Sequence, residues 1–391
     1  MVVLWMSELT WEIVNQIPAV GALRALGATV TSLEPLPITG QQTQAWQMIS
    51  GQNPGCTGYF DIWAPQQYRA QPVIEPTILG LHEVIAAAGC KATQVDLALT
   101  EVPAYLSEPG TPVDCLIVHT VAGEDIAAID QALQAACTWA GTGGACLLLS
   151  DYHAAAVKCY VNLNDGLRAL GVLEVSEQGT TRWKETLAYH VGHGQLWINL
   201  EGREPFGIVA PRDEYDQVCQ ALITSLPAKL LDPQTGEPVI EQVYRRDELY
   251  RGDYLFRAPD LVVVMRPGYA PSPNSVMLGF DGAVIWPAPD DTRATAGLHP
   301  TTVGGLVIAL GVPFATGQTI ARAPLGGIAP TLLHTLRLPI PTSIDATVIT
   351  DLFAPAFMQQ FPVQRAEQDS CLSAEDEEEI MARLQNLGYI G

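Results

Sequence analysis

The first 170 residues alternate between short apolar runs and segments in which apolar residues recur with helical spacing. Apolar runs of strand length occupy residues 2–6, 115–121 and 146–149. Residues 10–26 and 124–140 instead place apolar side chains every three or four positions, which is typical of amphipathic helices. This alternation predicts an α/β fold with a mostly parallel sheet and helices on both faces.

The apolar run Cys146–Leu149 ends abruptly at Ser150 and Asp151. This pattern is typical of a buried central strand with polar groups at its carboxyl end. Ligands of open α/β sheets bind just beyond these ends. We therefore predict that Asp151 lies near any functional site. The alternative is that Asp151 only caps the following loop.

Charge and hydropathy narrow the classes of partner. The 391 residues carry 42 acidic and 20 basic side chains, for a formal net charge of −22. Such an acidic surface repels nucleic acid and anionic lipid, although a locally positive pocket can still bind phosphate. No apolar run reaches the roughly 18 residues of a membrane span, and no basic residue precedes the apolar start. We therefore predict a cytoplasmic protein without a membrane span or a nucleic-acid partner.

The second half of the chain has less regular patterning. Strands are predicted at residues 186–200, 239–244 and 259–265, and a helix at 214–226. His190 and His193 flank Val191-Gly192, and the surrounding glycines favour a hairpin or loop over a helical metal site. Residues 372–391 predict a docked C-terminal helix, because a serine cap and an acidic first turn precede a regular apolar stripe.

Several segments of the chain carry a family resemblance. They include Ser150-Asp151, Val161–Leu167, Trp183–Tyr189, Ile198–Pro205, Ala258–Leu261 and Gly326–Pro341. Together they resemble the alkaline phosphatase superfamily, in its type I phosphodiesterase/nucleotide pyrophosphatase-like branch. The resemblance implies a three-layer α/β sandwich of the alkaline phosphatase type, forming a single domain over residues 1–391. It also implies a reduced cap, because the cap or insert region at residues 62–112 is short.

The resemblance further implies a catalytic centre of two metal ions, usually zinc, which bridge a phosphoryl group and activate a Ser or Thr hydroxyl. Ligand positions are retained at Asp125, Asp151 and His299, and the nucleophile position falls at Thr43, with Gln42 an equally close match. Three other ligand positions are changed, and they hold Ser7, Ile129 and Tyr152. His153 can supply the imidazole missing at Tyr152 only if the loop shifts by one residue.

These substitutions lead to a hypothesis of a pseudoenzyme with no bound cofactor. The catalytically silent relative would bind an unknown protein partner or a small anionic, phosphorylated ligand in the old cleft, or serve in an assembly. The alternative is an active metal-dependent phosphodiesterase or phosphatase with a rebuilt site, using zinc or another divalent cation. Simpler roles also exist: Asp125 suits a helix N-terminus, and His119 reads as a hydrogen-bonded core histidine.

Overall fold

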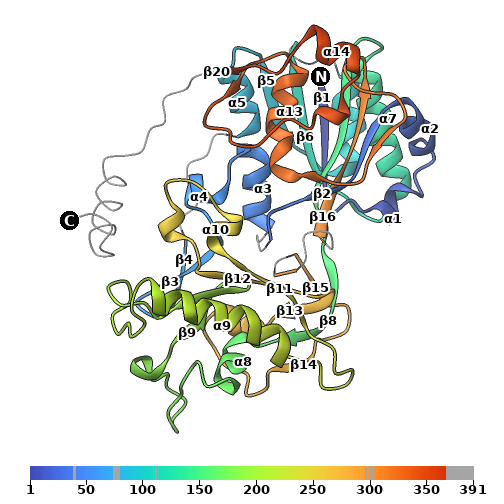
Figure 1. Cartoon of the computed structure of the whole chain (residues 1–391). Helices are drawn as coiled ribbons and strands as arrows, with labels where there is room; N and C mark the ends of the chain where they lie inside the picture. Colours follow the sequence, from blue (N-terminus) through green and yellow to red (C-terminus); the bar gives the residue numbers. More distant parts are fainter. Residues whose placement is uncertain are drawn as a thin grey trace.

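The computed structural model describes residues 1–37, 41–73, 80–108, 110, 112–295, 297–298 and 303–366. The predicted C-terminal helix at 372–391 and the candidate ligand His299 lie outside these ranges. Figure 1 shows an upper lobe built on a large sheet and a lower lobe built on smaller sheets.

The upper lobe contains the sheet that the alternating sequence predicts. Its strand order is β17-β2-β16-β7-β1-β6-β5, and β18 also pairs with β2. Strands β5, β6, β1 and β7 are mutually parallel, whereas β16 runs antiparallel to both β7 and β2. The predicted α/β fold with a mostly parallel sheet is therefore confirmed. The strands are β1 (Val2–Ser7), β2 (Ala28–Glu34), β5 (Ala92–Asp96), β6 (Cys115–Val121), β7 (Ala145–Tyr152), β16 (Gly304–Gly311), β17 (Gln318–Ile320) and β18 (Ala323–Pro324).

Two helical layers cover the two faces of this sheet (Figure 1). Successive strand residues point to opposite faces, so Val3 and Trp5 join one core cluster while Leu4 and Met6 join the other. The first face is covered by α3 (Gln41–Ser50), α5 (Leu81–Ala87), α13 (Ile328–Thr335) and α14 (Pro355–Gln360). The second is covered by α1 (Trp11–Val14), α2 (Val20–Leu26), α6 (Val102–Ser107) and α7 (Ile126–Ala140).

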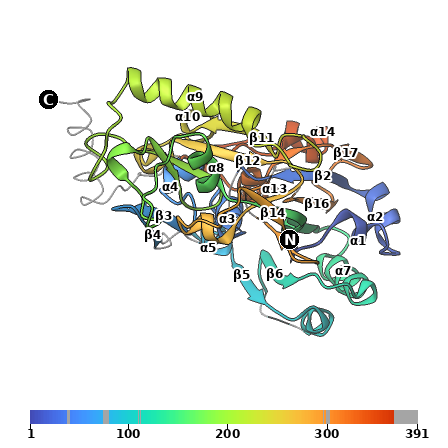
Figure 2. The same ribbon diagram turned by 90° about the horizontal axis from the view of Figure 1, so that it is seen from below.

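The lower lobe begins where the chain leaves β7 and enters β8 (Ala155–Val161). It has its own apolar core, with α8 (Leu163–Ala169) inside and α9 (Asp213–Lys229) along an outer face in both views (Figures 1 and 2). One four-stranded sheet has the order β11-β12-β10-β9, and a second joins β13, β8, β14 and β15. Their strands are β9 (Ala188–His190), β10 (Gln195–Ile198), β11 (Ile240–Arg245), β12 (Leu261–Met265), β13 (Gly268–Pro271), β14 (Ile285–Pro287) and β15 (Arg293–Ala294).

The described part of residues 62–112 serves both lobes. The hairpin of β3 (Trp63–Gln66) and β4 (Arg69–Pro72) packs on the lower lobe through Tyr68, which belongs to that core. The elements α5, β5 and α6 form one edge of the upper lobe. The short region thus completes the large sheet as well as adding a hairpin.

Three element boundaries differ from the sequence prediction. The helix predicted over residues 10–26 is divided into α1 and α2, because Pro18 lacks an amide hydrogen and disfavours helical backbone at the residue before it. Helix α7 begins at Ile126, with Asp125 as its N-cap. The strand predicted over 186–200 is the hairpin β9–β10, so the prediction that His190 and His193 lie in a hairpin is confirmed.

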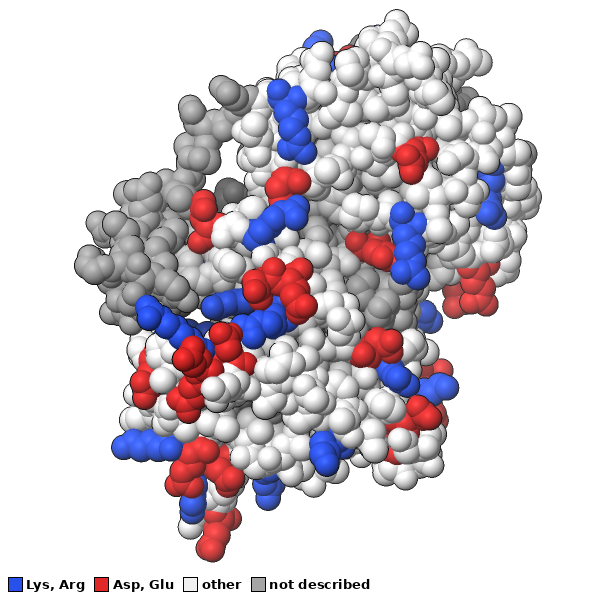
Figure 3. Space-filling model, viewed as in Figure 1, with Lys and Arg blue, Asp and Glu red and all other residues white. Residues whose placement is uncertain are grey.

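The surface view is consistent with the charge composition. Acidic and basic side chains lie side by side on the face in Figure 3, most densely over the lower lobe. The ion pairs of that lobe include those of Arg245 with Asp216 and Asp247. Within the described ranges, no helix is both long and apolar enough to cross a bilayer.

Candidate functional site

The carboxyl ends of β1, β6, β7 and β5 bring four polar side chains to one edge of the large sheet. Trp5 is paired with His119 on one side and with Leu149 on the other, and His119 is paired with Asp96. Since strand residues alternate between faces, Ser7 and Asp151, two positions beyond Trp5 and Leu149, lie on the same face as these two residues. That face is the one covered by α3.

A continuous hydrogen-bond chain links the four residues. The Ser7 hydroxyl donates to Asp151 Oδ1 over 2.9 Å, and Ser7 Oγ lies 3.2 Å from His119 Nε2. On the far side of the ring, His119 Nδ1 lies 2.7 Å from Asp96 Oδ1. The His119 ring also packs against the Trp5 indole, with centroids 4.3 Å apart. The imidazole is therefore fixed at three points.

The chain runs from solvent to the protein interior. The Asp96 side chain is 73% exposed and that of His119 is 26% exposed, whereas Ser7 and Asp151 are buried. The His119 ring therefore lies between the buried Ser7 hydroxyl and the exposed Asp96 carboxylate. The hydrogen-bond chain joins the buried Asp151 to the surface at this edge of the sheet.

Burial raises the pKa of the Asp151 carboxyl above its ordinary value, and hydrogen bonds from its neighbours, Ser7 among them, act in the opposite direction. Desolvation disfavours a charged carboxylate, so its stability in the fold depends on the donors around it. Ser7 thus contributes to the stability of the fold through a buried carboxylate.

We expect Ser7→Ala to lower the free energy of unfolding by about 1–3 kcal/mol, because a buried carboxylate would lose a donor. Urea denaturation of Ser7→Ala, Asp151→Asn and the double variant would measure the coupling between the two side chains. Ser107→Ala, at an exposed position, is the matched control and should stay within about 0.5 kcal/mol of wild type. Additive effects of Ser7→Ala and Asp151→Asn would contradict the coupling.

The two other positions carried over on α7 have structural roles. The Asp125 carboxylate is exposed and accepts the Ala128 amide hydrogen over 3.1 Å, which is the usual contact of an N-cap. Ile129 is fully buried in the core beneath α7. Neither residue contacts Ser7 or Asp151 in the described structure, so this helix adds no ligand to the sheet edge.

The nucleophile position lies in the first turn of α3. Thr43 is 1% exposed, and its hydroxyl has no hydrogen-bond partner among the described residues. Gln42 lies in the same turn, but its side chain is outside the described part. No hydrogen bond joins Thr43 to Asp151 in the described structure.

Tyr152 and His153 follow Asp151 at the end of β7. Tyr152 is buried, and its backbone oxygen accepts the Glu8 amide hydrogen and the Ser150 hydroxyl. His153 is half-buried, and its amide donates to the Val303 oxygen over 3.1 Å. These hydrogen bonds keep the backbone next to Asp151 in the pairing register of strand β7.

The described residues do not fit a two-metal centre. Each zinc ion needs about three or four protein ligands, and the described ranges hold no group of three or more His, Cys, Asp or Glu side chains arranged to bind a metal. The residues at the family's ligand positions explain why the described residues lack such a group. Ser7 and Ile129 stand at two of these positions, and Asp125 caps helix α7.

A comparison with protein families matches part of the chain. The model of the type I phosphodiesterase/nucleotide pyrophosphatase family matches residues 119–279. The predicted resemblance to this family is thereby confirmed. This segment includes β7, Asp151 and much of the lower lobe.

Solved structures of this family share the fold. Mouse ectonucleotide pyrophosphatase/phosphodiesterase 5 superposes with a TM-score of 0.56 at 10% identity, covering 90% of this chain and 100% of the mouse chain. An inactive variant of the mouse protein in complex with AMP gives 0.54 at 10% identity, covering 92% and 99%. The human protein gives 0.52 at 9% identity, with the same coverage. A search of curated proteins found no match. The alkaline-phosphatase-like fold is thus confirmed.

Sequence reasoning missed Asp96 and predicted His119 only as a hydrogen-bonded core histidine. The hydrogen bonds are present, to Ser7 and Asp96, but the His119 side chain is 26% exposed and so lies at the surface end of the site. The sequence did contain a usable signal. His119 is the only polar residue in the segment 115–119, and it lies two residues before the carboxyl end of the predicted strand 115–121.

Proposed function

We propose that this chain is a catalytically silent relative of the type I phosphodiesterases that binds a small phosphorylated ligand at the carboxyl edge of the large sheet. The observation that carries the proposal is the hydrogen bond from Ser7 to Asp151 within the chain to His119 and Asp96. Asp151, which stands at a metal-ligand position of the family, instead accepts a hydrogen bond from the Ser7 hydroxyl. The same hydrogen-bond chain holds the half-buried His119 imidazole at the sheet edge.

The chemistry of the edge supports a phosphorylated ligand. Phosphate oxygens accept hydrogen bonds from imidazole N–H groups, and the ligand would bind the His119 Nδ1–H in place of the exposed Asp96 carboxylate. An inactive variant of the mouse relative forms a complex with AMP. We propose a ligand of the same class, a nucleoside monophosphate, bound here without hydrolysis. A protein partner and a cytoplasmic location stay predictions.

The alternative is an active metal-dependent phosphodiesterase with a rebuilt site. One observation favours it: the Thr43 hydroxyl is buried and has no partner in the described structure, as a nucleophile awaiting substrate would be. Asp125, Asp151 and His299, with His153, would then be its metal ligands, and zinc or another divalent cation would supply the activation of the hydroxyl.

Three measurements test the proposal. Metal content of the purified protein, hydrolysis of bis(4-nitrophenyl) phosphate and 4-nitrophenyl phosphate with added zinc or manganese, and calorimetric titration with AMP separate the two functions. We expect AMP binding without turnover, and a loss of about tenfold in affinity, or roughly 1.4 kcal/mol, in His119→Asn. His153→Asn is the matched control and should bind AMP as wild type does.

Two outcomes would contradict the proposal. Stoichiometric metal together with turnover that disappears in Asp151→Asn and Thr43→Ala would establish the active enzyme instead. If AMP does not bind the wild-type protein at millimolar concentration, the proposal that its ligand is a nucleoside monophosphate is wrong.

A further inference from the structure

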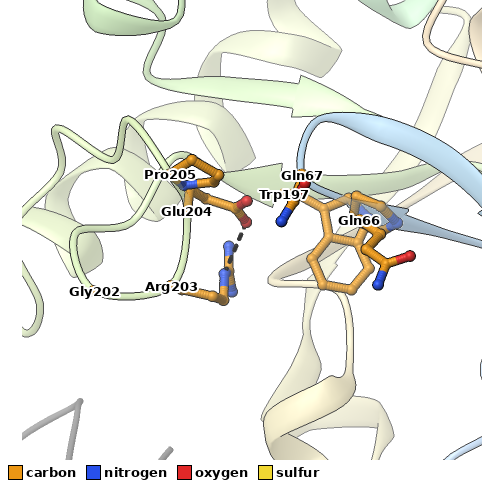
Figure 4. Close-up of a pocket in the computed structure, with 8 residues that line it drawn as sticks. Gln66, Gln67, Trp197, Gly202, Arg203, Glu204 and Pro205 are labelled. Atoms are coloured by element: carbon orange, nitrogen blue, oxygen red, sulfur yellow. Dashed lines mark hydrogen bonds and ion pairs between the residues drawn. The ribbon is translucent and has the colours of Figure 1, made fainter.

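A pocket of about 410 Å³ opens on the lower lobe, and none of the residues that line it belongs to the sheet edge described above (Figure 4). The tip of the β3–β4 hairpin contributes Gln66 and Gln67, β10 contributes Trp197, and the turn after β10 contributes Glu204 and Pro205. A volume of this size falls within the range of small-molecule sites.

The hairpin wall of the pocket is fixed in place by aromatic packing. Gln67 and Tyr68 both have positive φ, at 49° and 59°, which is the backbone of a tight hairpin turn and is unusual for residues other than glycine or asparagine. Tyr68 compensates for this conformation by stacking on Trp183 at 3.8 Å and by donating its hydroxyl to Asn199 over 2.6 Å. The two glutamines beside it are therefore presented from a rigid turn.

The opposite wall carries a positioned carboxylate. Glu204 Oε1 accepts from the Tyr189 hydroxyl over 3.0 Å and from Arg203 Nε over 3.1 Å. Glu204 Oε2 accepts no hydrogen bond from any described residue, and the carboxylate points toward the space beside Gln67 and Trp197 (Figure 4). The Trp197 side chain is 6% exposed, and its indole N–H has no partner in the described structure.

The charges around the pocket already balance. Arg203 contacts both Glu204 and Asp260, and Arg246 adds a second contact to Asp260, so two cations face two carboxylates. A charged ligand would disturb this balance. The remaining groups are one free carboxylate oxygen and two side-chain amides, next to Pro205 and the small exposed part of Trp197.

We propose that this pocket binds a pyranose ring of a carbohydrate. A pyranose is neutral, and its hydroxyls can donate to Glu204 Oε2 and exchange hydrogen bonds with the Gln66 and Gln67 amides. Its C–H surfaces, which are the apolar part of an otherwise polar ring, pack on Pro65, Pro205 and the exposed part of Trp197. The proposal does not rest on the ligand proposed for the sheet edge.

Saturation-transfer difference NMR with methyl β-D-glucoside, methyl β-D-galactoside and N-acetyl-D-glucosamine tests the pocket directly. We expect at least one of these sugars to bind with a Kd on the order of 1 mM, as a single small ligand of few atoms would. Gln67→Ala and Glu204→Gln should each weaken binding at least fivefold. Gln178→Ala, an exposed glutamine on another loop of the same lobe, should leave it unchanged.

Near-ultraviolet circular dichroism must first show that both variants are folded, because Glu204 is partly buried and Gln67 has a positive φ in the hairpin turn. Absence of binding by all three sugars overturns the proposal. Sugar binding that Gln67→Ala leaves intact also overturns it, because the sugar would then lie elsewhere. Binding of choline or inorganic phosphate in place of sugar, with the same response to Gln67→Ala, overturns it in favour of a charged ligand.

Discussion

Asp260→Asn is expected to lower the free energy of unfolding by about 3–5 kcal/mol, because it removes one partner of a buried ion pair. Arg203 donates to both Asp260 oxygens, over 2.9 and 2.6 Å. The same carboxylate accepts from the Ile198 amide over 2.7 Å and from the Tyr215 hydroxyl over 3.0 Å. An asparagine would place an NH₂ group against donors that now bond to a carboxylate oxygen. The buried Arg203 would keep its positive charge but lose the negative charge of its partner.

Urea denaturation at pH 7 measures this effect, and Asp213→Asn is the matched control. Asp213 is an exposed carboxylate in the first turn of α9, so its loss should cost less than about 1 kcal/mol. A loss of under 1 kcal/mol in Asp260→Asn would show that the pair does little more than offset its own desolvation.

The same residue predicts a component of acid sensitivity. Burial acts to raise the pKa of Asp260, but the charge and hydrogen bonds of Arg203 outweigh it and hold the pKa below the ordinary value. A depressed carboxyl pKa contributes stability that is present above the unfolded value near 4 and is lost as pH falls through the folded value. Asp260→Asn should therefore be less sensitive than wild type to acid below about pH 4.

The fold could be predicted from the sequence where one strong pattern decided each element. Apolar runs that end in polar residues identified β6 and β7, and helical spacing identified α7, since these elements lie in a core that demands such patterns. The predicted helix at 10–26 was divided because one proline outweighed an otherwise continuous apolar stripe. Local patterns could not supply the two-lobe arrangement, which depends on contacts between distant segments.

The candidate site was predicted only in part, for a physical reason. Asp151 could be placed at the sheet edge because a strand end is a local feature of the sequence. The roles of His119 and Asp96 depend on β6 lying between β5 and β1 in the register that sets His119 opposite both Asp96 and Trp5. Spacing along the chain carries no information about that register. The resemblance alone could not reveal that Asp125 caps α7, because a metal ligand and an N-cap share the same residue type.

The second large effect is expected from pH and comes from His190, which is fully buried at the β9–β10 turn. Its Nε2 accepts the Gly194 amide hydrogen over 3.0 Å, and its Nδ1 lies 2.9 Å from the Ser275 carbonyl oxygen, so the neutral ring satisfies both contacts. Gly192 and Gly194 have positive φ, at 82° and 85°, which lets the turn fold back onto the ring. Burial lowers the pKa of His190 from 6.5 to about 3.

The sign of the effect follows from linkage. Between about pH 6.5 and pH 3 the unfolded chain binds a proton at His190 that the folded chain does not, so stability falls as pH falls through this window. One proton changes the free energy by about 1.4 kcal/mol per pH unit, so the loss at pH 5 is about 2 kcal/mol relative to pH 7. His193 acts in a different window. Burial acts to lower the pKa of His193, but the charge and hydrogen bond of Asp61 outweigh burial and raise the pKa above its ordinary value. The stability that His193 contributes is therefore lost as pH rises through its folded pKa.

Urea denaturation of wild type and His190→Gln between pH 7 and pH 5 tests this expectation. Glutamine can accept the Gly194 amide hydrogen but cannot take up a proton, so the variant should lack the loss of about 2 kcal/mol between the two pH values. His82→Gln, a substitution of a half-buried histidine on α5, should retain the wild-type slope. The difference between variants cancels the other titrating groups, so equal slopes in wild type and His190→Gln would show that His190 is not held neutral by the fold.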